Sequence, residues 1–193
     1  YQDRTSIAVI RMGQSLSAPP LSAVTLRLRC YVRTRLENSF GTMRLALLLF
    51  GRGSANGIYL NAGASNLSYG VGGSVGSASD NIVGDAWYDI VIAANASGVE
   101  LYIDGDLKSS TSGSSSIDIY DSVGSSDSCL IGASDYDEGV EYNDQRVFDG
   151  IIQDFAIWDK KLTAQEISDL YTSGTSEPLI SDTSPITYNA ALD

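Results

Sequence analysis

The sequence predicts an all-β protein in which two antiparallel sheets pack face to face, with one short helix near the C-terminus. Three observations carry this prediction: an alternating stretch at residues 24–33, a nearly continuous apolar stretch at residues 42–50, and a strand followed by a capped helix at residues 148–171. In a half-buried strand apolar and polar residues alternate, and a strand covered on both faces is apolar throughout. Apolar residues that recur with a period of 3.6 indicate a helix. A chain of 193 residues fits a single domain, 1–193, with a substantial core.

The segment from Phe148 to Tyr171 joins a predicted strand to the predicted helix. The strand follows Gly150 and is rich in β-branched and aromatic residues. Thr163 and Glu166 then have the spacing of a capping box, in which each side chain bonds the other residue's amide. Leu162 and Ile167 are placed to form a hydrophobic staple around this cap. The sequence therefore predicts a helix that begins at Thr163, ends at Gly174 and turns one apolar face toward the sheet.

The stretch at residues 24–33 alternates along its whole length. One face carries Val24, Leu26, Leu28, Cys30 and Val32, and the other carries Thr25, Arg27, Arg29, Tyr31 and Arg33. We expect the first face to be buried and the arginines to point outward. Such a ladder could bind an anionic glycan or a partner protein, or it could be a solvated, salt-bridged sheet face. The acidic residues elsewhere in the chain favour the second interpretation.

Charge is unevenly distributed along the chain, which has a net charge of −12 and no histidine. Eight arginines and two acidic residues lie up to Gly53, whereas four basic and 22 acidic residues follow. We therefore expect an Arg-bearing strand of the first half to lie beside acidic segments of the second. The acidic total argues against nucleic acid as a partner. No apolar run approaches the ~18 to 20 residues of a membrane span, so we expect no membrane insertion.

The two cysteines, Cys30 and Cys129, each lie within a strand-like stretch. Two buried free thiols are favoured over a disulfide, because buried cysteine behaves as a small hydrophobic residue. A bridge between them would imply an oxidising compartment.

Four landmarks follow one another between Trp87 and Gly174. They are Trp87-Tyr88-Asp89-Ile90-Val91, the stretch from Gly98 to Gly105, Leu130-Ile131-Gly132, and the strand and capped helix at residues 148–171. In this order they resemble the concanavalin A-like, laminin-G-like jelly-roll domains, which include pentraxin-like members. The resemblance implies a jelly-roll sandwich in which Trp87 and Trp158 are core residues.

The segment from Asp135 to Asp149 concentrates carboxylates in one loop. Carboxylates this close repel one another unless they are solvated or bridged by a cation, and oxygen ligands suit calcium. A solvated acidic loop is the favoured interpretation, but laminin-G-like and pentraxin-like relatives often hold calcium at a sheet rim, so the resemblance adds a calcium site as the alternative. Its candidate ligands, which could instead form a solvated acidic loop, are Asp135, Asp137, Glu138, Glu141 and Asp144.

Binding is better supported by the sequence than catalysis. Without histidine the Ser-His-Asp, Cys-His and zinc-His sites are excluded, and the E-x-D-x-x-E strand of jelly-roll glucanases does not occur. Lectin-like sandwiches use aromatic rings to stack on sugars and amide or carboxylate groups to bond their hydroxyls. The candidate ligand contacts are Tyr69, Tyr136, Tyr142 and Asn143, although each tyrosine taken alone could be a packing residue.

The sequence therefore predicts a non-catalytic recognition module for carbohydrate or a cell-surface partner. The chain begins at Tyr1 without a basic-then-apolar leader, so we expect a mature product or a domain of a larger extracellular, secreted or virion-surface protein. The alternative is a decoration or tail-fibre domain of a phage particle, which would bind neighbouring virion subunits or form a homo-oligomer. Sedimentation and glycan arrays distinguish the two.

Overall fold

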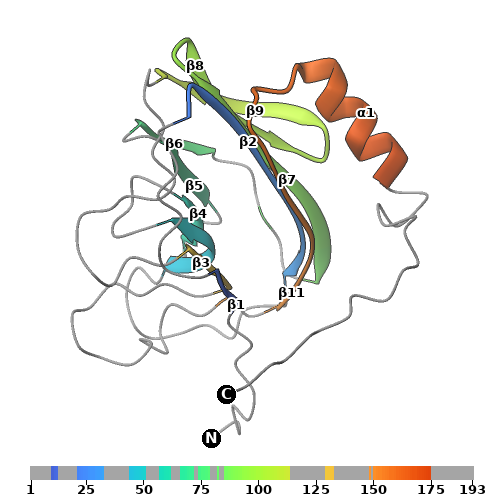
Figure 1. Ribbon diagram of the computed structural model, residues 1–193. Helices are drawn as coiled ribbons and strands as arrows, with labels where there is room; N and C mark the ends of the chain where they lie inside the picture. Colours follow the sequence, from blue (N-terminus) through green and yellow to red (C-terminus); the bar gives the residue numbers. More distant parts are fainter. Residues whose placement is uncertain are drawn as a thin grey trace, which may run out of the picture.

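The structure is a computed structural model (Figure 1) that describes residues 10–12, 21–32, 44–50, 57–61, 66–71, 74–78, 82, 85–113, 129–132, 148 and 150–174. Its strands form two sheets that face each other, and α1 (Ala164–Gly174) lies outside one of them. The predicted sandwich of antiparallel sheets with one short helix near the C-terminus is confirmed.

Among the described residues the two sheets have six and five strands, and the order in the first is β1-β10-β3-β4-β5-β6. They are β1 (Ile10–Met12), β10 (Cys129–Ile131), β3 (Arg44–Phe50), β4 (Gly57–Asn61), β5 (Asn66–Val71) and β6 (Ser74–Ala78). All five pairings are antiparallel. The apolar stretch at residues 42–50 therefore supplies a strand, β3, with a neighbour on each side.

The second sheet has five strands in the order β11-β2-β7-β8-β9. They are β11 (Gly150–Trp158), β2 (Ala23–Val32), β7 (Ala86–Asn95), β8 (Gly98–Ile103) and β9 (Asp106–Thr111). All four pairings are antiparallel. The arginine-bearing strand β2 thus lies between β11 and β7, both from the acidic part of the chain that follows Gly53, as the charge distribution predicted.

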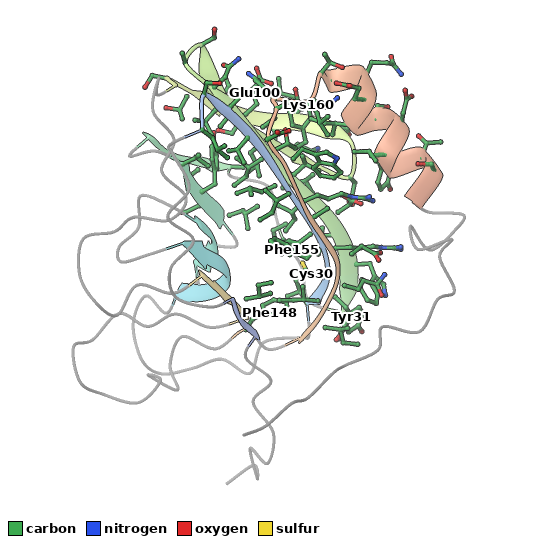
Figure 2. All side chains as sticks on the ribbon, viewed as in Figure 1. Cys30, Tyr31, Glu100, Phe148, Phe155 and Lys160 are labelled. Atoms are coloured by element: carbon green, nitrogen blue, oxygen red, sulfur yellow. The ribbon has the colours of Figure 1, made fainter. Side chains whose placement is uncertain are left out.

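The main core lies between the sheets and follows the predicted alternation of β2. Val24, Leu26 and Leu28 are fully buried and pack with Ile90 and Ile92 of β7. Figure 2 shows Cys30, Phe148 and Phe155 in the same space between the sheets. Cys30 is a free, buried thiol, as predicted, and its burial raises its pKa to about 12. The Cys129 side chain lies outside the described side chains.

A second apolar cluster lies on the outer face of the five-stranded sheet, beneath α1. Val91, Ala93 and Tyr102 of the sheet pack against Leu162 and Ile167 of the helix segment. The capping box and the staple are both confirmed: the Glu166 amide donates to Thr163 Oγ1 at 3.2 Å, and the Thr163 amide donates to Glu166 Oε2 at 2.7 Å. α1 therefore covers one end of this outer face.

The helix corrects the prediction for the arginine face of β2. Arg27 was expected to point outward into solvent or a surface salt bridge, but it is 1% exposed because α1 covers it. Its Nε lies 3.0 Å from both carboxylate oxygens of Asp89, its Nη2 bonds Asp89 Oδ2, and both residues are buried. Thr25 is buried too, and its hydroxyl donates to Lys160 O at 2.7 Å and accepts from the Leu162 amide at 2.9 Å. These side chains attach the helix segment to the sheet.

A bulge in β11 sets which of its residues face outward. The register with β2 gains one residue between Gln153 and Ala156, and Asp154 takes a positive φ of 54°. The extra residue keeps Ile152 and Phe155 on the core side, whereas Ile151 and Gln153 are exposed on the outer face. Within the described ranges, no helix has the length and apolarity needed to cross a bilayer.

Candidate functional site

The end of the outer face that α1 leaves uncovered carries a row of large apolar side chains. Tyr31 of β2 lies opposite Trp87 of β7 on one side and Ile151 of β11 on the other. Trp87 is 39% and Ile151 is 47% exposed, and Tyr31 is half-buried between them. Figure 2 shows Tyr31 at the opposite end of the sheet from Lys160 and Glu100, which lie at the helix-covered end. We call Tyr31, Trp87, Ile151 and Arg29 the outer platform.

The platform's side chains support one another. The rings of Tyr31 and Trp87 lie 5.5 Å apart, centroid to centroid, at an interplanar angle of 56°. The Arg29 guanidinium lies 5.3 Å from the Trp87 ring centroid, a cation–π distance. The Tyr31 hydroxyl also donates to Asp85 Oδ1 at 3.4 Å. The Trp87 ring thus lies between the Tyr31 ring and the Arg29 guanidinium.

The exposure of Trp87 corrects the expectation that it is a core residue. Along β7 the core side chains are Tyr88, Ile90 and Ile92, so Trp87 shares the outer face with Asp89. The alternation also places Val91 and Ala93 on the face of Trp87, but α1 covers those two and leaves the Trp87 end open. The other tryptophan, Trp158, is half-buried and packs on the cluster beneath α1.

The chemistry of the platform is that of binding. Its members are two aromatic rings, one aliphatic side chain and a guanidinium, and none of these is placed as a general base or an activated nucleophile. Acceptors lie at its rim, because Asp85 is exposed beside Tyr31 and Gln153 is exposed beside Ile151 on the same face. An apolar floor with a polar rim fits a ligand that has both C–H faces and hydroxyl groups.

Tyr69, predicted as a ligand contact, lies elsewhere. It is 0% exposed in the core between the sheets, because it alternates in phase with Leu67 and Val71 of β5. Its hydroxyl donates to Ser109 Oγ at 2.9 Å, and Ser109 Oγ donates to Ser77 O at 3.0 Å. The structure therefore makes Tyr69 a packing residue that joins the edges of the two sheets, and the prediction that it contacts ligand is wrong.

The other predicted site residues lie outside the described residues. They are the ligand contacts Tyr136, Tyr142 and Asn143, and the calcium ligands Asp135, Asp137, Glu138, Glu141 and Asp144. These assignments stay predictions. In the part of the chain that the structure describes, no group of three or more carboxylate, thiol or imidazole side chains is placed to hold a metal ion.

Comparison with protein families gives one match over most of the chain. The family model described as the concanavalin A-like lectin/glucanases superfamily matches residues 25–168. No curated protein matches the sequence.

Solved structures share the fold at low sequence identity. A candidate carbohydrate binding protein from Bacteroides ovatus is 14% identical with a TM-score of 0.63, and the match covers 83% of this chain and 43% of that one. The SAP-like pentraxin of Limulus polyphemus is 15% identical with a TM-score of 0.56, covering 88% and 78%. Domain 4 of the extracellular arabinanase AbnA from Geobacillus stearothermophilus, in complex with arabinotriose, is 17% identical with a TM-score of 0.54, covering 84% and 72%. The chain thus spans less than half of the Bacteroides protein, and the likenesses confirm the jelly-roll fold.

Proposed function

Because the chain belongs to the concanavalin A-like lectin/glucanases superfamily, we propose that it is a non-catalytic module that binds carbohydrate on its outer platform. It would do so as part of a secreted or surface-exposed protein. The observation that carries the proposal is the exposed row of Ile151, Tyr31 and Trp87 across three neighbouring strands.

Exposing the apolar side chains of Ile151, Tyr31 and Trp87 to water is unfavourable, and a binding role for this row would explain why they are exposed. Large apolar side chains gathered on one face of a soluble protein mark an interaction site more often than chance exposure does. The face of an aromatic ring carries partial negative charge, which attracts the polarised C–H groups of a sugar ring lying on it. Tyr31 and Trp87 offer such faces, with Arg29 and Asp85 beside them as a donor and an acceptor for hydroxyl groups.

Two of the structural neighbours support the choice of ligand class. The Bacteroides ovatus protein is a candidate carbohydrate binding protein, and the AbnA domain was solved with arabinotriose. Because identity is below one fifth in both, the sugar itself cannot be carried over.

The test is a glycan array followed by calorimetric titration of the best binder. Trp87→Ala should weaken binding about tenfold or more, which corresponds to about 1.4 kcal/mol or more. Leu107→Ala is the matched control, since Leu107 is a large apolar residue on β9 that is 55% exposed and away from the platform. Equal affinities for wild type and Trp87→Ala would refute the platform as the binding site.

The glycan array also tests the alternative function, that of a decoration or tail-fibre domain. If it stays blank with calcium and with a chelator, the carbohydrate proposal fails. A stable trimer or larger assembly in sedimentation, together with that blank array, would favour a decoration or tail-fibre domain that binds neighbouring subunits.

A further inference from the structure

Strand β7 extends beyond its partner β8 at the end that carries Trp87. The last paired residues of the two strands are Ile90 and Ile103, whereas β7 continues back to Ala86. Residues 86–89 are therefore paired on one side, by β2, and have no β8 residue paired with them on the other side. A strand end that extends past its neighbour's ladder depends more on individual hydrogen bonds than the centre of the sheet does. Trp87 lies within this segment.

Asp104 continues the ladder past the end of β8. Its amide donates to Asp89 O at 2.9 Å, and its side-chain Oδ1 accepts from the Asp89 amide at 2.9 Å. In a regular antiparallel pair both bonds would be made by backbone groups. Here Asp104 takes a φ of 53° and Gly105 a φ of 82°, so the chain turns away and the carboxylate replaces the missing carbonyl.

We propose that Asp104 is a positioning residue that holds the Trp87 end of β7 in the geometry needed for ligand binding. Asp89 is two residues from Trp87, so the pair of bonds at Asp89 fixes the backbone from which the ring projects. The proposal rests on the proposed function for its consequence, because what is positioned is the carbohydrate platform.

The surroundings of Asp104 make it rigid. Gly105 lies against the last turn of α1, where a Cβ would come within 3.1 to 3.3 Å of the Tyr171 side chain. The same helix end lies close to Arg27, whose Nη2 is 3.5 Å from Leu170 O and whose Nε bonds the Asp89 carboxylate. Asp89 is thus held through its backbone by Asp104 and through its side chain by Arg27.

The groups around Asp104 act on the charge of its carboxylate in opposite directions. Burial raises its pKa, the negative charges of Asp89 and Asp106 act in the same direction, and the bond from the Asp89 amide and the charge of Lys108 oppose them. The hydrogen bond from the Asp89 amide needs an oxygen acceptor at this position, which either a carboxylate or an amide side chain supplies.

The test compares three substitutions in the hairpin turn. Asp104→Gly removes the acceptor while tolerating a positive φ, and Asp104→Asn keeps a side-chain oxygen at a φ that asparagine also tolerates. Asp106→Gly is the control, since the Asp106 side chain is 79% exposed and its ion pair with Lys108 is long, with 3.7 Å between Oδ2 and Nζ. Two readouts are needed: amide hydrogen exchange along β7, and affinity for the glycan found by the array.

We expect Asp104→Gly to speed exchange of the Asp89 amide about tenfold or more, with little change at the central Ile92 amide, and to weaken glycan binding about tenfold. Asp104→Asn and Asp106→Gly should resemble wild type in both readouts. Unchanged exchange at Asp89 in Asp104→Gly, or equal losses in Asp104→Gly and Asp104→Asn, would overturn the proposal. If wild type binds no glycan, the proposed function fails while the exchange readout still decides whether Asp104 holds β7.

Discussion

The buried ion pair beneath α1 gives the sharpest test of the fold. Arg27 is 1% and Asp89 is 5% exposed, and the guanidinium bonds both carboxylate oxygens. Arg27→Met removes the positive charge but keeps much of the side-chain volume. It leaves the Asp89 carboxylate buried between β7 and α1 without its partner.

The expected loss follows from the cost of an unpaired buried charge. Breaking a buried pair from one side destabilises a protein by about 3 to 5 kcal/mol. For a chain of this size each kcal/mol lowers the melting temperature by roughly 2 to 4 °C, so the midpoint should fall by about 6 to 20 °C. Replacing both partners, Arg27→Met with Asp89→Leu, should recover most of that loss, because no charge then remains to be desolvated.

Urea denaturation of wild type, both single variants and the double variant completes a double-mutant cycle. Lys160→Met is the control, since its ion pair with Glu166 joins side chains that are 56% and 43% exposed, and it should shift the midpoint far less. A loss below about 1 kcal/mol for Arg27→Met would show that Asp89 can reach water and that α1 does not seal this face. A double variant as unstable as the singles would refute the charge argument.

Three further predictions concern the cap, the core and the acidic loop. Thr163→Ala should lower the free energy of unfolding by about 1 kcal/mol in denaturation. The hydrogen bonds of Glu166 to Lys160 and Thr163 lower the pKa of its carboxyl from 4.5 to about 2. The stabilisation from Glu166 should therefore be present above pH 4.5 and disappear as the pH falls toward 2. Gly76→Ala should destabilise more than this cap variant, because its Cβ would lie 2.5 Å from the buried Tyr69 ring, and an unchanged melting temperature would contradict that contact. Calcium should raise the melting temperature above that of chelator-treated protein if the loop at residues 135–144 binds it, and an identical melting temperature would count against the site.

The features predicted correctly were those that depend on near neighbours in sequence. The alternation of β2 follows from the two-residue period of a strand, so Leu26 and Leu28 could be assigned to the core from the pattern alone. The capping box of Thr163 and Glu166 spans three residues, and its two hydrogen bonds formed as predicted.

The candidate site was predicted poorly, because exposure is decided by distant segments. Arg27 and Arg29 share one face of one strand, yet one is buried beneath α1 and the other is half-exposed beside Trp87. Tyr69 and Tyr31 are equally plausible ligand contacts by residue type, but one faces the opposite sheet and the other the outer surface. No local pattern distinguishes these pairs.

The sequence by itself determined where individual strands occur, which side of each is apolar, and the position and N-cap of the helix, because each of these is set by interactions within a few residues. The tertiary structure decided which outward-pointing side chains meet solvent. It placed the segment before α1 on β2 through Thr25 and Leu162, 137 positions apart, and so covered one end of the outer face and left Tyr31, Trp87 and Ile151 at the other. Burial is a property of the surface left after all elements have packed, so no stretch of sequence carries it alone.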